Sequence, residues 1–163
     1  METSGPDNHP KRDEASDAFF MAESLKEARR AYEMGEVPIG CVITLDGKII
    51  ARAANERATR ANALCHAEIL AIGAACEVVG DWRLENCCLY VTIEPCPMCA
   101  GAIIQARIPT VVYGAKNPKA GSAGSILNIL EEPRFNHQAE VVSGVCEEEC
   151  AGIMREFFLR FRG

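Results

Sequence analysis

Residues 87–115 read CCLYVTIEPCPMCAGAIIQARIPTVVYGA, and this stretch decides the fold. It opens with a continuous apolar run over 87–93 and closes with another over 110–115, each typical of a strand buried on both faces. Between the two runs a helical pattern begins at Pro95, since a helix accepts proline at its start, and it ends before Pro109. Strand, helix and strand in this order predict a right-handed parallel crossover.

An amphipathic helix is predicted near the start of the chain. Apolar side chains recur every three or four residues from 21 to 32, which is the spacing of one helix face. Ser16 or Asp17 is expected to cap the first turn, and Gly35 is expected to end the helix. Residues 1–15 are polar, contain proline and have no periodic pattern, and we expect them to form a disordered tail.

A β-hairpin and a second helix are predicted between this helix and the buried strands. Two β-rich runs within residues 38–53 flank Asp46 and Gly47, a pair that suits a type I′ turn because both positions need positive φ. Apolar side chains then recur with helical spacing over 66–79, and Gly80 is expected to stop this helix. The stripe expected to face the core comprises Ile69, Ile72, Cys76 and Val79.

The downstream sequence completes an α/β pattern. A glycine-rich loop over 116–125 is followed by a predicted short helix over 126–130, a strand over 139–145 and a final helix over 147–161. Strands and helices that alternate after a hairpin predict a layered α/β domain with a mixed five-stranded sheet. The length of 163 residues suits one domain, which we place at 16–163. The final helix is expected to present Ile153, Phe157 and Phe161 to the core, with Met154 and Phe158 beside them.

The composition argues against several functional classes. The net charge of −6 argues against a non-specific nucleic-acid coat, which is usually basic. The sequence has no secretory signal and no apolar run near the roughly 20 residues of a membrane span, so we expect no membrane partner. Nine cysteines without such a signal indicate a reducing, cytoplasmic setting, where clustered cysteines more often serve metal binding or catalysis than disulfides.

Four residues in two segments have the spacing of a catalytic metal site. His66 and Glu68 begin the second helix, and Cys96 and Cys99 lie three residues apart at the start of the third, so both sulfurs can face one ion. One imidazole and two thiolates suit zinc and leave a fourth position open, as in catalytic sites. Glu68 can then take a proton from the activated water and return it to a leaving group.

Each half of this pattern also has a simpler explanation. His66 can be a helix cap or a surface residue, the C-x-x-C pair can be a redox pair or part of a structural site, and Glu68 can merely favour the helix dipole. The rival outside enzymes is therefore a structural zinc or partner-binding module. The two halves together favour catalysis, because both lie at helix starts, where an α/β sheet gathers its active groups.

The segments HAE and PCPMC resemble the H-x-E and P-C-x-x-C signature of the zinc nucleoside and nucleobase deaminases. The segments EVPIGCVI, VVYGAKNPKAGSAGS, FNH and VVSGVCEEEC narrow the resemblance to the bacterial tRNA adenosine deaminases, over roughly residues 19–161. This resemblance implies a three-layer α/β/α cytidine deaminase-like fold. It also implies one Zn²⁺ per subunit, and hydrolytic deamination of adenosine to inosine at wobble position 34 of tRNA anticodons.

The resemblance implies partners as well. The anticodon stem-loop is the expected substrate, and a homodimer is the expected assembly, with a paired-subunit arrangement as its alternative. Guanine deaminase, which shares HAE and PCPMC and acts on a free base, is the close rival. The segments GSAGSILNIL and FNH favour the tRNA enzyme over guanine deaminase.

The resemblance also assigns residues by position. His66, Cys96 and Cys99 match the metal ligands, and Glu68 matches the residue that carries the proton. Asn55 matches the asparagine that hydrogen-bonds the flipped nucleoside, although at the end of a hairpin strand it can equally be a turn residue.

Two further positions concern the nucleic acid. Asn117 lies at a position close to the substrate ribose, where many bacterial members carry aspartate. Because an amide is neutral and both donates and accepts, Asn117 predicts weaker discrimination between RNA and single-stranded DNA, and the alternative is natural variation at this position. Lys119, with Lys116 and Arg134, is expected to hold phosphates, and the alternative for each is ordinary solvated surface charge.

Overall fold

The protein is described by a computed structural model over residues 12–161. Its centre is one five-stranded sheet in the order β2-β1-β3-β4-β5. β1 is antiparallel to both β2 and β3, whereas β3, β4 and β5 are parallel, which confirms the predicted mixed sheet and its parallel crossover. The elements are α1 (Glu14–Glu33), β1 (Gly40–Leu45), β2 (Lys48–Ala54), α2 (Ala67–Val79), β3 (Cys87–Ile93), α3 (Pro97–Gln105), β4 (Thr110–Ala115), β5 (Glu140–Val142) and α4 (Glu147–Arg160).

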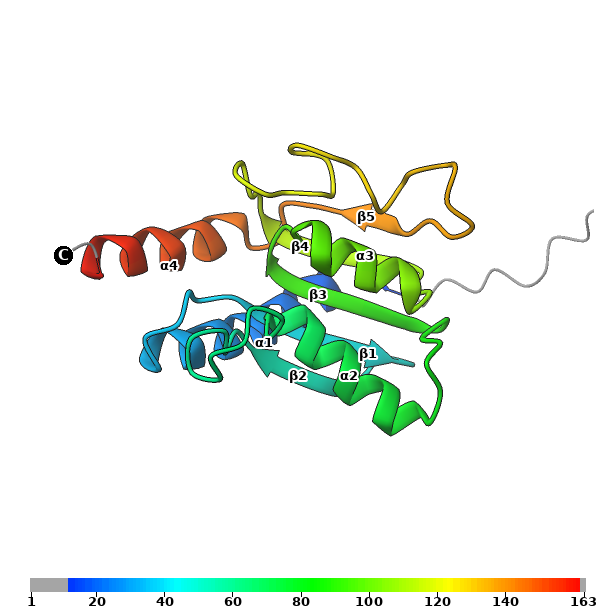
Figure 1. The fold of residues 1–163 in the computed structure, drawn as a ribbon, viewed down its shortest axis with the longest axis horizontal. Helices are drawn as coiled ribbons and strands as arrows, with labels where there is room; N and C mark the ends of the chain where they lie inside the picture. Colours follow the sequence, from blue (N-terminus) through cyan, green and yellow to red (C-terminus); the bar gives the residue numbers. More distant parts are fainter. Residues whose placement is uncertain (1–11, 162–163) are drawn as a thin grey trace, which may run out of the picture.

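Helices cover both faces of the sheet. In Figure 1, α2 and α3 lie side by side in front of the sheet, whereas α1 lies behind it and packs with α4. Successive β3 residues face opposite layers: Leu89 belongs to the core under α2 and α3, and Tyr90 to the core under α1 and α4. Two cores on one sheet confirm the three-layer α/β/α architecture. No helix within residues 12–161 is both long enough and apolar enough to cross a bilayer.

The predicted hairpin turn and the predicted end of α2 are confirmed. Asp46 and Gly47 both have positive φ, at 52° and 75°, as a type I′ hairpin turn requires. Gly80, with φ of 76°, ends α2 in the left-handed conformation that glycine adopts without strain. The local turn chemistry therefore sets where the hairpin reverses and where α2 ends.

The predicted helix starts were wrong by a few residues. α1 begins at Glu14 with Asp13 as its cap, because the Asp13 carboxylate accepts a bond of 2.7 Å from the Ser16 amide and the Ser16 hydroxyl accepts one from the Asp13 amide. The tail predicted over 1–15 therefore ends too late, and its residues 1–11 lie outside the described part. α3 begins at Pro97, not at the predicted Pro95, and Cys96 is its N-cap.

Two other predictions need correction. Residues 126–130 do not form a helix but an irregular segment with an isolated bridge between Ala123 and Asn128. The Gly124 amide there donates to the Leu127 carbonyl, which is opposite to the direction of a helical hydrogen bond. Ile153 and Phe157 are buried as predicted, but Phe161, the residue after α4, is half exposed. Figure 1 shows α4 extending past the edge of the sheet.

The face of α2 that packs on the sheet was predicted only in part. Its buried residues are Ala67, Glu68, Ala71 and Ala75, whereas the expected stripe of Ile69, Ile72, Cys76 and Val79 is half-buried or exposed. Alanines have the shortest apolar side chains, so they let the helix lie close to the sheet. Of the larger side chains, Ile72 and Cys76 still pack against the edge of the same core, whereas Val79 is exposed.

Ala71→Leu should therefore lower the free energy of unfolding by about 1–3 kcal/mol, because a fully buried helix face has no room for a larger side chain. Denaturant unfolding measures this. Gly73→Ala is the matched control on the same helix, since a methyl group there meets open space and is expected to add about 0.5–1 kcal/mol. An Ala71→Leu protein as stable as the wild type would contradict the close alanine packing.

Candidate active site

The candidate residues meet at one edge of the sheet. β2, β3 and β4 run in the same direction, because β1 is antiparallel to β2 and β3, and β3 is parallel to β4. Asn55 follows β2, Cys96 follows β3 and Asn117 follows β4. The polar segments after these strands therefore gather at the carboxyl edge, where α/β sheets bind their ligands.

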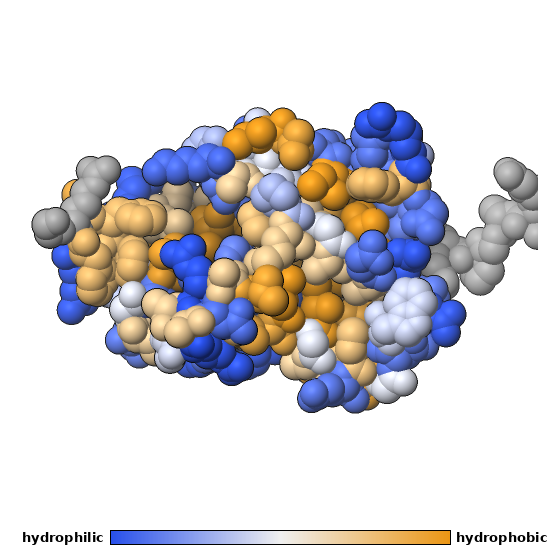
Figure 2. Space-filling model, in the orientation of Figure 1, coloured by the Kyte–Doolittle hydropathy of each residue, from blue (hydrophilic) through white to orange (hydrophobic). Residues whose placement is uncertain are grey.

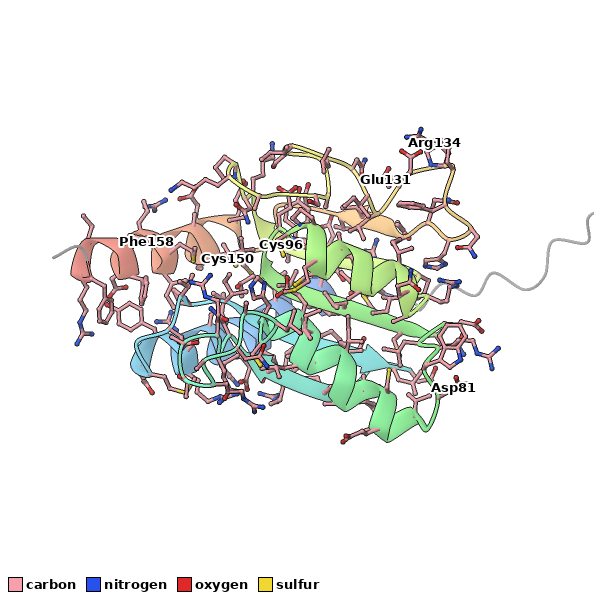
Figure 3. All side chains as sticks on the ribbon, viewed as in Figure 1. Asp81, Cys96, Glu131, Arg134, Cys150 and Phe158 are labelled. Atoms are coloured by element: carbon pink, nitrogen blue, oxygen red, sulfur yellow. The ribbon has the colours of Figure 1, made fainter. Side chains whose placement is uncertain are left out.

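His66, Cys96 and Cys99 form one cluster. The His66 Nδ1 atom lies 3.6 Å from the Cys96 sulfur and 3.5 Å from the Cys99 sulfur, and the three ligand atoms lie within 4.8 Å of one another. His66 is the N-cap of α2 and Cys96 is the N-cap of α3, so the adjacent starts of two helices hold the cluster. Figure 3 shows Cys96 where α3 begins beside α2.

The spacing of this cluster fits a tetrahedral zinc ion. With Zn–N near 2.0 Å and Zn–S near 2.3 Å, a nitrogen and a sulfur ligand lie roughly 3.5 Å apart. The two nitrogen–sulfur distances in the cluster agree with this value. Cys65 does not join the cluster despite being next to His66. The structure thus brings together the three side chains that the sequence selected.

The charges of the cluster are strongly coupled. Hydrogen bonding from the Cys99 thiol, reinforced by His66, lowers the pKa of Cys96 to about 4. The pKa of Cys99 is raised, first by that same hydrogen bond to Cys96 and then by burial. The hydrogen bond to Cys96 raises the pKa of His66. One sulfur is therefore held as thiolate, the form that binds metal.

Glu68 lies beside the cluster and is buried. Its side chain is 4% exposed, and burial raises its pKa to about 7. Its carboxyl group also interacts with the Cys99 thiol. A surface glutamate that only favoured the helix dipole would have no reason to be buried, so this simpler explanation of Glu68 does not fit.

A small pocket opens next to Glu68. It has a volume of about 320 Å³ including its open mouth, and Val37, Ile39, Asn55, Arg57, His66, Ala67 and Glu68 line it. The Asn55 amide donates to the Val37 carbonyl at 3.2 Å and accepts from the Arg57 amide at 3.3 Å. Asn55 is thus a turn residue and a pocket residue at once, with one N–H and one lone pair left for a ligand.

Asn117 and Lys119 lie on the neighbouring loop, and neither lines this pocket. The Asn117 side-chain oxygen accepts from the amides of Lys119 and Ala120, at 3.3 and 3.1 Å, which forms a local turn. Lys119 is exposed. Arg134 is exposed too, pairs with Glu132 and lies well away from Cys96 in Figure 3.

The sequence did not reveal the importance of Glu94, which organises the loop after β4. This buried carboxylate accepts from the amides of Asn117, Ala123 and Ser125 at 3.0–3.1 Å, and from the Ser125 hydroxyl. Burial acts to raise its pKa, but these hydrogen bonds outweigh burial and lower it. Gly121 is required there, because a Cβ would lie 2.5 Å from the carboxylate.

Replacing Glu94 with glutamine should release this loop. The amide keeps the shape of the side chain but turns an N–H toward backbone donors, so amide exchange at Ala123 and Ser125 should accelerate at least about tenfold. Hydrogen exchange read by mass spectrometry measures this, and Glu85→Gln, at an exposed position, is the control. Unchanged protection of the loop would show that Glu94 does not hold it.

Glu36 holds the loop on the other side of the pocket, and it was also missed. It is buried, and its carboxylate accepts from the amides of Ala58 and Thr59 at 2.9–3.2 Å. Each of the two loops beside the candidate site is thus held by hydrogen bonds to one buried carboxylate. The one available clue in the sequence was an acidic residue next to a strand, a signal too common to be specific.

Known proteins share this sequence and this fold. The family of MafB19-like deaminases matches residues 15–162. A tRNA-specific adenosine deaminase of Bacillus subtilis is 56% identical over 146 residues, which cover 90% of this chain and 91% of that protein. A tRNA-specific adenosine deaminase of Agrobacterium fabrum is 46% identical, over 88% of this chain and 95% of that protein.

Solved structures agree with the sequence relatives. A structure from work on A-to-I editing by tRNA:A34 deaminases superposes with a TM-score of 0.80 at 47% identity, covering 83% of this chain and 98% of that one. A guanine deaminase of Nitrosomonas europaea superposes with a TM-score of 0.76 at 21% identity, covering 96% and 95%. At this low identity, the similarity to the guanine deaminase shows only a shared fold.

Proposed function

Because the chain belongs to the tRNA-specific adenosine deaminases, we propose that it converts adenosine to inosine at position 34 of tRNA anticodons by hydrolysis. The observation that carries the proposal is the buried Glu68, which lines one pocket with His66 and Asn55 beside two cysteines. A structural zinc module has no use for a buried carboxylate at the wall of an open pocket.

Different residues of the chain bind the metal, transfer protons and orient the substrate. His66, Cys96 and Cys99 would hold zinc, which when bound supplies a Lewis acid able to lower the pKa of water to about 7. Glu68 takes one proton from the attacking water and delivers it to the purine ring. It then carries a second proton, from the new hydroxyl group on C6, to the amine, so that ammonia leaves and the C6 carbonyl forms. Asn55 orients the flipped nucleoside through the N–H and lone pair that its backbone bonds leave free.

Inosine formation in an arginine-tRNA anticodon stem-loop tests this function, with metal content measured on the same sample. The expected result is inosine at position 34 and about one zinc ion per chain. Release of ammonia from free guanine, with none from the stem-loop, would instead identify a guanine deaminase. Stoichiometric zinc without turnover on either substrate would favour the structural module.

A homodimer is part of the same proposal. Figure 2 shows apolar surface across the face formed by α2 and α3. On α2, Val78 is exposed and Ile69 is half-buried, so both offer apolar surface to a partner. A patch of this kind marks an interaction surface. Light scattering should therefore give twice the chain mass of 17.7 kDa, and a monomeric mass would reject the dimer.

Tolerance of single-stranded DNA is proposed from Asn117. Its side-chain oxygen is occupied by the local turn, so the free amide N–H₂ is the group left to meet a ribose. A donor does not require a 2′-OH as strictly as a carboxylate acceptor does. Deamination of matched RNA and DNA hairpins tests this, and robust RNA activity without any DNA activity would contradict it.

A cytoplasmic location is the last element of the proposal. Two observations support it: all nine cysteines are free thiols, as expected in a reducing compartment, and tRNA is a cytoplasmic substrate. Fractionation of the source cells, with the protein detected by antibody, tests this location. Recovery with the membrane fraction would contradict it.

A further inference from the structure

Arg57 lies at the mouth of the candidate pocket. It lines that pocket together with Asn55, His66 and Glu68, and its side chain is exposed. Its backbone amide donates to the Asn55 side-chain oxygen at 3.3 Å, and this hydrogen bond fixes the backbone of Arg57 to the pocket wall. The amides of the next two residues bond to the buried Glu36, which fixes the turn that carries Arg57.

The other arginines nearby are neutralised by acidic partners, and Arg57 is not. Arg60 and Arg30 both pair with Glu56, with nitrogen–oxygen distances of 2.7 and 3.7 Å. Arg52 pairs with glutamates of α1 in the same way. Within residues 12–161, Arg57 forms no ion pair at all. It is therefore a guanidinium that remains available for an anionic ligand at the entrance of the pocket.

We propose that Arg57 binds a backbone phosphate of the target RNA strand at the point where the strand enters the pocket, an inference that rests on the proposed function. A base that is turned out of its stack enters a pocket while its phosphates stay at the rim. The planar fork of guanidinium matches two phosphate oxygens. In a chain of net charge −6, attraction of RNA must come from such local cations.

Binding measured against salt tests the phosphate contact. The probe is a fluorescent RNA hairpin with adenosine at position 34, and every protein carries zinc and Glu68→Ala so that no turnover occurs. Adding Arg57→Ala should weaken binding about tenfold. The slope of log affinity against log salt should become shallower by about 0.7, the value for one contact to a single strand. Arg57→Lys, which keeps the charge, should keep the slope.

Arg60→Ala is the matched control, because Arg60 lies three residues away, pairs with Glu56 and does not line the pocket. It should leave both affinity and slope unchanged. A neutral methylphosphonate placed at each position of the hairpin in turn locates the contact. At one position it should weaken binding to the Glu68→Ala protein that retains Arg57, and it should have no added effect once Arg57→Ala is present.

The outcomes separate this inference from the proposed function. If the wild type forms inosine and Arg57→Ala binds like Arg60→Ala, the phosphate contact is wrong and the function stands. Weaker binding with an unchanged salt slope would likewise reject a phosphate ligand. If the wild type forms no inosine, the function fails, and a shallower slope for Arg57→Ala would still support an anion contact. Arg57→Gln, which keeps most of the side-chain stem, repeats the test should the alanine variant misfold.

Discussion

Replacing Glu68 with alanine is expected to lower kcat about a thousandfold, because a positioned acid–base group contributes about 10²–10⁴-fold to a reaction of this kind. The zinc content should stay the same, since the candidate metal cluster consists of His66, Cys96 and Cys99 without Glu68. Stability should hold or rise, because the variant no longer buries an ionisable group. Single-turnover inosine formation, zinc analysis and denaturant unfolding on one preparation give all three values.

Glu77→Ala is the control for this experiment, because Glu77 lies on the same helix and is exposed. It should retain the turnover of the wild type. A Glu68→Ala protein that deaminated at the normal rate would refute the assigned mechanism. A Glu68→Ala protein without zinc would instead make Glu68 part of the metal site and not the proton carrier.

Replacing Cys99 with alanine is expected to abolish both zinc binding and turnover. Cys99 is fully buried and its sulfur lies 3.5 Å from the His66 nitrogen, so the two remaining ligands cannot enclose the ion. The zinc affinity should fall more than about 100-fold, because even outer partners of metal ligands contribute about 10–100-fold. Competition against a chromophoric chelator measures the affinity, and inosine formation measures the turnover.

Cys76→Ala removes one thiol from the same protein without touching the cluster, and it is the matched control. It should keep both zinc and activity. For the wild type, removing the metal with a chelator should stop turnover, and added zinc should restore it. A Cys99→Ala protein with stoichiometric zinc would mean that the cluster is not the metal site.

Much of the fold was predictable because it is governed by local patterns. The fully buried β3 and β4 were visible as continuous apolar runs, and the hairpin turn at Asp46 and Gly47 depends on two residues alone. The orientation of α2 was not predictable in this way. Periodicity identifies an apolar stripe, but which stripe meets the sheet depends on how closely the helix approaches it, and here Ala71 and Ala75 allow close contact.

The candidate metal cluster was also predictable, since spacing along two helices is a local property. His66, Cys96 and Cys99 were selected from the sequence, and the structure brings their ligand atoms together. Asn117 and Lys119 were selected only through resemblance, and they lie on a loop beside the pocket and not on its wall. The roles of these residues in binding and turnover remain predictions for the experiments above.

The sequence by itself determined the strand–helix–strand unit and the candidate metal-binding side chains, because helix and strand periods depend on neighbours in the chain. Only the tertiary structure decided which side chains hold the loops beside the pocket. Glu94 binds amides 23–31 residues away, and Glu36 binds amides 22 and 23 residues away. Which buried carboxylate meets which loop is set by how the strands pair, and strand pairing is non-local.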